Sequence, residues 1–272
     1  MRLVRGERHL GVLSATDRVL QRVLPRVRPA WVADWLKAGL RVQRKPLETP
    51  EGCFWVDPIS NLGVALAGGG YEEEMAATLH RLLQPGHVFV DVGANEGYFS
   101  VIAGRLVGSG GRVVAVEPQA RLHAVILKNC ALNGITNVEL CGNAVGREPA
   151  MRTLHLAPTT NHGSSSFYRG TRYAVRTQDV ETATLGQVLD QFGLERVDLM
   201  KMDIEGAEYE ALLGGEAVFR ARRVRRLALE LHPVALDRQG ATPDDLLRLL
   251  AGWGYRPDPQ FSHLVLMADD VP

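Results

Sequence analysis

The chain has 272 residues, of which 46% are apolar and 23% are charged, and its formal net charge is zero. This length suits one large α/β domain with an extension, and the neutral chain has no global field that would attract a nucleic acid. No apolar run approaches the ~20 residues of a membrane span, the N-terminus lacks a secretory signal, and the three scattered cysteines suit a reducing compartment. We therefore expect a cytoplasmic protein without stable membrane insertion.

Residues 1–45 differ in charge from the rest of the chain. They carry eleven Lys and Arg against three Asp and Glu, whereas residues 46–272 carry twenty against twenty-eight. Pro25 and Pro29 separate two expected helices in this segment. We expect a basic helical extension over 1–45, packed on a domain that spans 46–272. A substrate lid, an oligomer contact and an anionic membrane surface remain open as alternative roles.

The next stretch predicts a strand pair, a glycine turn and a helix. Residues 51–66 have the pattern of a hairpin or short strand pair, and three glycines follow at 68–70. Met75, Leu79 and Leu82 then recur at helical spacing. The acidic residues just before them suit the first turn of a helix because of its dipole.

Residues 88–116 have the pattern of a nucleotide-binding βαβ unit. A buried parallel strand is predicted over 88–92, a glycine turn over 93–97 and an amphipathic helix over 98–107. A second buried strand follows at 112–116 and ends in Glu117, at ~20 positions past the turn, where a carboxylate suits the hydroxyls of a ribose. This pattern fits either a dinucleotide or S-adenosylmethionine.

The glycine spacing favours S-adenosylmethionine. A dinucleotide fingerprint requires further glycines that make room for a pyrophosphate, and Asn95 and Tyr98 stand in their places. S-adenosylmethionine has no phosphate, and its ammonium group would be attracted to a carboxylate such as Asp91 or Glu96.

Further strands and helices follow. We expect helices over 120–133, 185–192 and 243–250, strands over 138–141, 197–204 and 227–231, and a final antiparallel pair that ends at 263–267. Residues 151–184 interrupt this order with two strands, over 153–156 and 173–177, joined by a hydroxyl-rich loop.

Charged residues gather at the predicted ends of the fourth and fifth strands. Asp203 and Glu205 follow one strand, and Glu230 and His232 follow the next. Because open α/β sheets bind ligands at this edge, Asp203, Glu205 and His232 are candidate acids or bases. Lys201 is alternatively a structural partner for Asp203. The same carboxylates and imidazole would also suit Mg²⁺ or Mn²⁺; we leave that alternative open and assign no metal ligand.

Three segments together resemble the FkbM-type methyltransferases. They are D-V-G-A-N-E-G-Y-F-S at 91–100, A-V-E-P-Q at 115–119 and K-M-D-I-E-G-A-E at 201–208. The resemblance extends roughly from Glu51 to the C-terminus. It implies a Rossmann-like class I fold, with a mostly parallel, doubly wound, seven-stranded sheet and an antiparallel C-terminal hairpin. It also implies S-adenosylmethionine as cofactor and O-methylation of a natural product or glycan.

The resemblance and the strand pattern together assign the candidate site. The cofactor-binding candidates are Tyr71, Glu72, Asp91, Gly93, Asn95, Gly97, Glu117, Asn143 and Ala144. The substrate-binding candidates are Asn161, Ser164, Ser165 and Glu230, and the catalytic candidates are those given above. The expected partner is a small molecule with a hydroxyl, and a homodimer is an open assembly state.

Two other functions remain open on the sequence alone. A nucleotide-linked oxidoreductase could use the same βαβ unit, and a non-catalytic binding module could keep the fold. Asn95 and Tyr98 argue against the first. The gathering of acidic residues with His232 would be unexplained in the second.

Overall fold

The computed structural model of the chain describes residues 15–23, 32, 36, 37, 39, 40, 42–158, 161–168 and 176–269. Within this part of the chain, no helix is both long enough and apolar enough to cross a membrane. α1 (Ala15–Val23) belongs to the basic N-terminal segment. The second helix expected there, around Trp31 and Trp35, lies mostly outside the described residues.

A seven-stranded sheet forms the centre of the described structure, with the order β11-β12-β10-β9-β3-β4-β5. Its strands are β3 (Val88–Val92), β4 (Arg112–Val116), β5 (Val138–Cys141), β9 (Leu199–Met202), β10 (Arg226–Leu229), β11 (Tyr255–Pro257) and β12 (Val265–Ala268). Neighbours from β10 to β5 pair in parallel, whereas β12 pairs antiparallel with β10 and with β11. The expected doubly wound sheet with an antiparallel hairpin is thus confirmed.

The order of the chain reverses direction between β3 and β9. From β3 the chain continues outward to β4 and β5, and it then returns to place β9 on the other side of β3. In open α/β sheets, ligands bind beyond the carboxyl ends of the strands at such a reversal. The topology therefore locates the candidate site.

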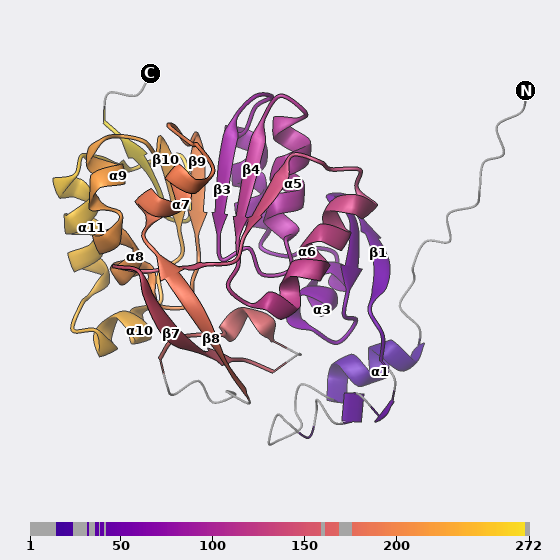
Figure 1. The fold of residues 1–272 in the computed structure, drawn as a ribbon. Helices are drawn as coiled ribbons and strands as arrows, with labels where there is room; N and C mark the ends of the chain where they lie inside the picture. Colours follow the sequence, from indigo (N-terminus) through magenta and orange to yellow (C-terminus); the bar gives the residue numbers. More distant parts are fainter. Residues whose placement is uncertain are drawn as a thin grey trace, which may run out of the picture.

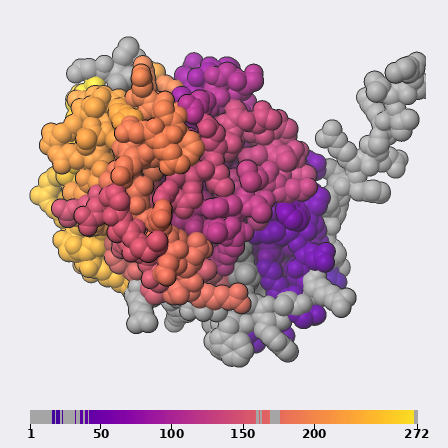
Figure 2. All heavy atoms as spheres, in the orientation of Figure 1, coloured from indigo at the N-terminus to yellow at the C-terminus, as the bar shows by residue number. Residues whose placement is uncertain are grey.

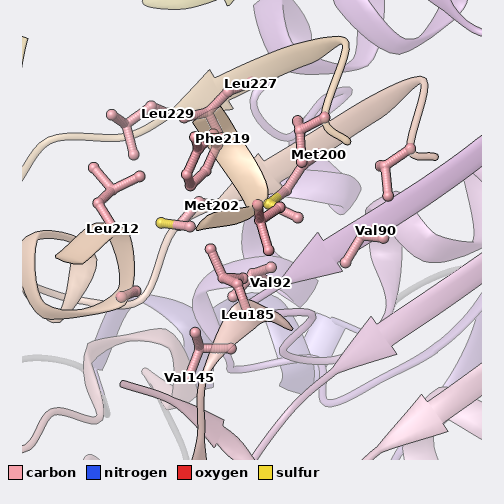
Figure 3. Close-up of a cluster of buried hydrophobic side chains, with 14 of the residues drawn as sticks. Val90, Val92, Val145, Leu185, Met200, Met202, Leu212, Phe219, Leu227 and Leu229 are labelled. Carbon is pink, nitrogen blue, oxygen red and sulfur yellow. The ribbon is translucent and has the colours of Figure 1, made fainter. Parts of the chain in front are cut away.

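The two faces of the sheet bury separate apolar cores, because successive residues of a strand point to opposite faces. Val90 and Val92 face a core with Met200, Met202 and Phe219, whose side chains meet in Figure 3. Phe89 belongs to the opposite core. The first core is covered by α7 (Leu185–Gln191), α8 (Glu208–Gly214), α9 (Glu216–Arg220) and α11 (Pro243–Gly252). The second is covered by α4 (Glu73–Leu82), α5 (Tyr98–Val107) and α6 (Ala120–Leu132).

The segment expected as a strand pair over 51–66 is only partly a strand pair. The hairpin is β1 (Lys45–Thr49) with β2 (Gly52–Val56), and α3 (Asn61–Gly68) follows it. The prediction missed this helix. Its first turn is closed by the Ser60 side chain, which accepts a hydrogen bond from the Gly63 N–H, and its end is closed by Gly69 in a left-handed conformation.

A small second sheet lies beyond the carboxyl ends of the central strands (Figure 1). It consists of β6 (Ala144–Val145), β7 (Ala150–Leu156) and β8 (Arg176–Ala183), and β7 and β8 pair antiparallel along their length. The second strand of this pair was expected at 173–177 and in fact runs over 176–183. A 3₁₀ turn, η2 (His162–Ser164), lies in the loop between them.

The molecule has its first and last elements on opposite flanks. In Figure 2 the C-terminal third occupies one side of the visible face and the β1–β2 region the other. α10 (Pro233–Arg238) lies on the C-terminal side, directly after β10. Between these flanks, the carboxyl edge of the sheet faces the β7–β8 pair.

Candidate active site

A cavity lies at the carboxyl edge of the central sheet, between α3 and the small second sheet. It contains about 1100 Å³ of empty space, its open mouth included, which is ample for a small-molecule site. The predicted site residues in its wall are Tyr71, Glu72, Gly93, Asn95, Glu117, Ala144, Asn161, Ser165, Asp203, Glu205 and Glu230. Those that do not contribute to the wall are Asp91, Gly97, Asn143, Ser164 and His232.

The turn after β3 forms the floor of the cavity. Gly93, Asn95 and Gly97 all have positive φ angles, of 88°, 51° and 80°. A side chain at Gly93 would place its Cβ 1.8 Å from the Asp203 carbonyl oxygen, so only glycine allows β3 and β9 to end this close together. The Asn95 Oδ1 atom is buried and has no hydrogen-bond partner within the described residues. It is an acceptor left for a polar ligand.

Glu117 extends from the end of β4 into this turn. One of its carboxylate oxygens accepts the Asn95 N–H at 2.8 Å and the other accepts the Gln119 N–H at 2.9 Å. Burial raises the pKa of Glu117 to about 7, although these two hydrogen bonds oppose the rise. Each oxygen keeps a further lone pair, so the carboxylate can accept two hydroxyls such as those of a ribose. The cavity therefore fits the cofactor that the sequence predicts.

Asp91 is fully buried and does not contribute to the cavity wall, so its role as a cofactor-binding residue stays a prediction. It is fully buried in β3, where it accepts the Ser100 hydroxyl at 2.6 Å. Lys201 is also buried, and its ammonium lies 3.2 Å from Asp203 and 5.2 Å from the centre of the Phe99 ring. Burial alone would lower the pKa of Lys201, but Asp203, Asp91 and Glu72 together raise it. Lys201 therefore balances several carboxylates, as its structural interpretation expected.

Tyr71 and Glu72 close another side of the cavity. The Tyr71 ring packs edge-on against Tyr98, with ring centres 5.5 Å apart. Burial, followed by the nearby Glu72 carboxylate, raises the pKa of the Tyr71 phenol. Burial likewise raises the pKa of Glu72, which has a left-handed backbone with φ of 43° before α4. Both side chains contribute to the cavity wall, and their role in binding the cofactor stays a prediction.

Four carboxylates surround His232 at the ends of β9 and β10. The His232 Nδ1 atom lies 3.0 Å from an oxygen of Glu208. Its Nε2 atom lies 3.6 Å from Glu205, 3.8 Å from Asp203 and 4.0 Å from Glu230. The predicted gathering of these groups is thus observed, and Glu208 is an additional member.

The charge on His232 argues against its role as a free base. Burial would lower the pKa of the imidazole, but the Glu208 hydrogen bond and the surrounding carboxylates raise it to about 9. The imidazole is therefore protonated at neutral pH. Burial raises the pKa of Glu205 to about 7, and Glu205 faces the cavity. By geometry and protonation, Glu205 is better placed than His232 to accept a proton.

Glu96, a candidate for the ammonium of the cofactor, is engaged by the N-terminal segment. Its carboxylate lies 2.6 Å from the Arg44 guanidinium, and its side chain is 1% exposed. Arg44 also donates to the Trp55 carbonyl oxygen at 3.1 Å. Glu96 contributes to the cavity wall, but its charge is balanced by Arg44 without any ligand.

Three other predicted residues have local structural roles. Asn143 accepts a hydrogen bond from the Cys141 thiol, while its neighbour Ala144 reaches the cavity. Gly97 begins α5, where a Cβ would lie 3.2 Å from the Ile126 side chain. Ser164 accepts a hydrogen bond from the Asn161 side chain at 2.6 Å. A turn motif or a polar loop in the sequence identifies these residues as candidates. It does not predict which of their side chains line the cavity.

The hydroxyl-rich loop is tied to the cavity wall by its own hydrogen bonds. Ser165 donates to the Gln119 side chain at 3.0 Å and accepts the Ala157 N–H at 2.9 Å. Asn161 accepts a hydrogen bond from Asn61 of α3 at 2.9 Å. These contacts join α3, the end of β4 and the β7–β8 loop around the cavity, and they use polar groups that were predicted for the acceptor.

Sequence reasoning missed several members of the site. Asn61, Gln119 and Ser166 line the cavity, and Glu208 orients His232. The available signal was weak: Gln119 follows the E-P dipeptide of the motif, and Glu208 ends K-M-D-I-E-G-A-E. The helix that carries Asn61 was not predicted, so its approach to the cavity could not be foreseen.

The fold and the site together define a class I S-adenosylmethionine-dependent methyltransferase. The sheet order, the glycine turn after β3 and the acidic end of β4 are its features on this chain. Residues 91–257 match the family described as the methyltransferase FkbM domain. This match covers more than half of the chain, so the chain belongs to the FkbM methyltransferase family, and the resemblance seen in the motifs is confirmed.

Curated relatives of the chain include other methyltransferases. The chain is 27% identical over 212 residues to the 31-O-demethyl-FK506 methyltransferase FkbM of Streptomyces tacrolimicus, covering 66% of this chain and 78% of that protein. It is 30% identical over 154 residues to methyltransferase sdnD of Sordaria araneosa, and the match covers 46% of this chain and 59% of that protein. It is also 31% identical over 208 residues to the AMB antimetabolite synthetase AmbE of Pseudomonas aeruginosa, with 61% of this chain but 10% of that protein covered. The chain thus spans less than two thirds of the latter two relatives.

Similarity to solved structures is weaker. Methyltransferase FkbM from Methylobacillus flagellatus is 15% identical with a TM-score of 0.43, covering 71% of this chain and 50% of that chain. SMU.1697c, a putative methyltransferase from Streptococcus mutans in complex with SAH, is 13% identical with a TM-score of 0.42. The match covers 72% of this chain and 94% of that chain. These likenesses add nothing to the family assignment.

Proposed function

We propose that the protein transfers a methyl group to a hydroxyl oxygen of a small natural product or glycan. The observation that carries the proposal is that Asp203, Glu205 and Glu230 line the same cavity as Glu117. One cavity can then hold the cofactor over β3 and β4 and the acceptor over β9 and β10. The relative named 31-O-demethyl-FK506 methyltransferase supports oxygen as the methylated atom.

The cofactor half of the cavity is assigned to the ends of β3 and β4. When bound, S-adenosylmethionine supplies an electrophilic methyl group. Glu117 would accept the ribose hydroxyls, because two backbone N–H groups already fix its carboxylate. Asn95 has an unpartnered oxygen at this side, and Ala144 forms part of the apolar wall. Tyr71 and Glu72 would border the methionine end.

The acceptor half is assigned to the ends of β9 and β10. Asp203 and Glu205 would accept the proton of the acceptor hydroxyl, and Glu230 and Asn161 would orient the acceptor. His232 holds the carboxylates together by its charge. A positioned base contributes about 10²–10⁴-fold in rate, and the confinement of both substrates supplies the rest by proximity.

The substrate in this proposal is a small molecule. We do not propose a nucleic acid as substrate. The methyltransferase family of the chain displaces the nucleotide-linked oxidoreductase that the βαβ unit left open. A non-catalytic module would leave the acidic residues around one cavity without a purpose. The homodimer remains a proposal for measurement in solution.

The proposal is tested with isotopically labelled S-adenosylmethionine and a panel of acceptors that offer hydroxyl, amine or thiol groups. We expect label on a hydroxyl oxygen, located by NMR of the product. The Asp203→Asn variant should lower kcat by about 10²–10⁴-fold while its affinity for S-adenosylhomocysteine stays nearly unchanged. Transfer to nitrogen or sulfur, or a variant that keeps full turnover, would contradict the proposal.

A further inference from the structure

Glu205 has a left-handed backbone, with a φ of 53°, which is uncommon for a residue that carries a side chain. It lies in the turn at 203–206 that follows β9, and its side chain contributes to the cavity wall. A residue other than glycine keeps such a conformation only where the surrounding structure holds it. The contacts that hold this turn therefore decide where the Glu205 carboxylate lies.

A buried carboxylate closes the turn from the inside. Glu208, the first residue of α8, is fully buried and does not contribute to the cavity wall. One of its oxygens, Oε1, accepts the backbone N–H of Ile204 at 3.0 Å and that of Gly206 at 3.2 Å. These are the N–H groups of the two residues that flank Glu205. The backbone around Glu205 therefore cannot turn without breaking a hydrogen bond to an ionised group, which is stronger than a neutral one.

The same Glu208 oxygen also holds the His232 ring. It lies 3.0 Å from the Nδ1 atom, which donates to it because the imidazole is protonated. The Nε2 atom at the other end of the ring lies 3.6 Å from Glu205, and Asp203 and Glu230 are the other acids that face it, at 3.8 and 4.0 Å. One carboxylate oxygen thus fixes both the backbone of Glu205 and the positive charge beside its side chain.

Two other side chains support the same turn from outside. The Ser166 hydroxyl, in the β7–β8 loop, donates to the Glu205 carbonyl oxygen at 2.9 Å. The Gln239 amide, directly after α10, donates to the Gly206 carbonyl oxygen at 2.7 Å. Neither side chain hydrogen-bonds the imidazole within the described part of the chain. Glu208 is therefore the residue that couples the turn to the ring.

We propose that Glu208 is a positioning residue for methyl transfer, which directs Glu205 into the cavity and fixes the His232 ring beside it. The inference rests on the proposed function, in which the proton of the acceptor hydroxyl passes to a carboxylate at this edge. Glu208 does not touch the acceptor, because it is fully buried and lies outside the cavity wall. It acts on the reaction through Glu205 and His232.

Two substitutions in the full chain separate the charge of Glu208 from its place in the turn. Glu208→Gln keeps an oxygen that can accept the same N–H groups but removes the charge, whereas Glu208→Ala removes both. We expect kcat to fall about 10²-fold in Glu208→Ala, because a misplaced catalytic group costs about this much, and to fall less in Glu208→Gln. The affinity for S-adenosylhomocysteine should stay nearly unchanged in both, since the cofactor half of the cavity is held by other residues.

Glu210→Gln is the matched control. Glu210 is a second acid in the first turn of α8 and does not contribute to the cavity wall. The substitution removes the same charge from the same helix terminus, so it tests whether any loss of charge there lowers turnover. This variant should keep the wild-type kcat.

The His232 ring gives a second measurement, which does not depend on activity. Proton NMR follows the titration of the imidazole, and its signal is assigned by its loss in His232→Gln. In Glu208→Gln the ring should lose its proton at a lower pH than in the wild type, because the Glu208 carboxylate raises the pKa of His232. Glu210→Gln should titrate as the wild type does.

Two results would overturn the positioning role. One is a Glu208→Gln protein that is folded by circular dichroism and keeps the wild-type kcat, even if its free energy of unfolding falls. The other is a His232 titration that is the same in this variant and in the wild type. Where Glu208→Ala does not fold, Glu208→Gln alone decides. The proposed function fails separately, when the wild type transfers no methyl group to a hydroxyl, and the titration still tests the contact between Glu208 and His232.

Discussion

At the scale of single residues, Glu117 combines a fixed position with a protonation change near neutral pH. Its buried carboxylate accepts the Asn95 and Gln119 N–H groups, and burial is the main cause of its raised pKa. The folded pKa of about 7 lies above the ordinary value of 4.5. Ionisation of Glu117 therefore lowers the free energy of unfolding. The stability that the protonated Glu117 carboxyl contributes is fully present below about pH 4.5 and is lost as the pH rises through 7.

Cofactor binding should have the opposite dependence on pH. Ribose hydroxyls donate hydrogen bonds to the ionised carboxylate, so binding favours the form that is present above pH 7. We expect the affinity for S-adenosylhomocysteine to rise about tenfold per pH unit up to about 7 and then to level off. Calorimetry at several pH values measures this.

Two variants serve as controls for this dependence. Glu117→Gln should bind weakly at every pH, because its side chain has no ionisation. Glu205→Gln should keep the slope, since Glu205 has a similarly raised pKa but belongs to the other half of the cavity. A wild-type affinity that does not change over this range would refute the assignment of Glu117 to the ribose.

At the scale of elements, the turn between β3 and α5 depends on the glycine at its start. A Cβ at Gly93 would lie 1.8 Å from the Asp203 carbonyl oxygen, and the φ of 88° adds strain for any other residue. We expect Gly93→Ala to lower the free energy of unfolding by about 2–5 kcal/mol and to weaken cofactor binding. Urea unfolding and calorimetry measure the two effects.

Gly134→Ala is the matched control for this substitution. Gly134 follows α6 with a φ of 66°, and a Cβ added there would meet no other atom within 4 Å among the described residues. It should suffer only the backbone strain, about 1–2 kcal/mol, and should bind the cofactor normally. Equal losses in both variants would mean that the close approach of β3 and β9 does not matter.

The elements also show which local patterns are reliable. The strands at 88–92, 112–116 and 138–141 were predicted with their observed limits, because buried parallel strands are short, continuous apolar runs bounded by turns. α3 was missed because its apolar residues and glycines give no clear helical period. A Ser60 cap and burial of Leu62 and Leu66 against the rest of the fold make it a helix.

At the scale of the whole molecule, the last residues of the N-terminal segment belong to the domain structure. The predicted division at residue 46 separates them from it. β1 begins at Lys45, whose side chain forms an ion pair with Asp17. Arg44 pairs with Glu96 in the turn that carries the cavity floor. We propose that the domain begins at Val42, so that both residues belong to it.

Two shortened chains test this division. A chain that begins at Val42 loses Lys37, the ion-pair partner of the buried Asp57, so it should be less stable than the full chain. It should nevertheless keep its affinity for S-adenosylhomocysteine, because Arg44 is retained. One that begins at Pro46 should bind more weakly or unfold, because Glu96 loses its Arg44 partner in a buried position, at a cost of about 3–5 kcal/mol. If both chains bind equally well, Arg44 has no part in the site and the division at residue 46 holds.

The sequence by itself determined the central sheet, the glycine turn and the acid at the end of β4. These features depend on residues that are close in the chain, and they follow from strand alternation and from the backbone freedom of glycine. Only the tertiary structure decided which side chains meet. Glu208 and His232 are 24 positions apart and Arg44 and Glu96 are 52 apart, so no local pattern could pair them. Likewise, Asp91 stands in the motif, but in the fold it is fully buried, accepts a hydrogen bond from the Ser100 hydroxyl and lies near the charge of Lys201.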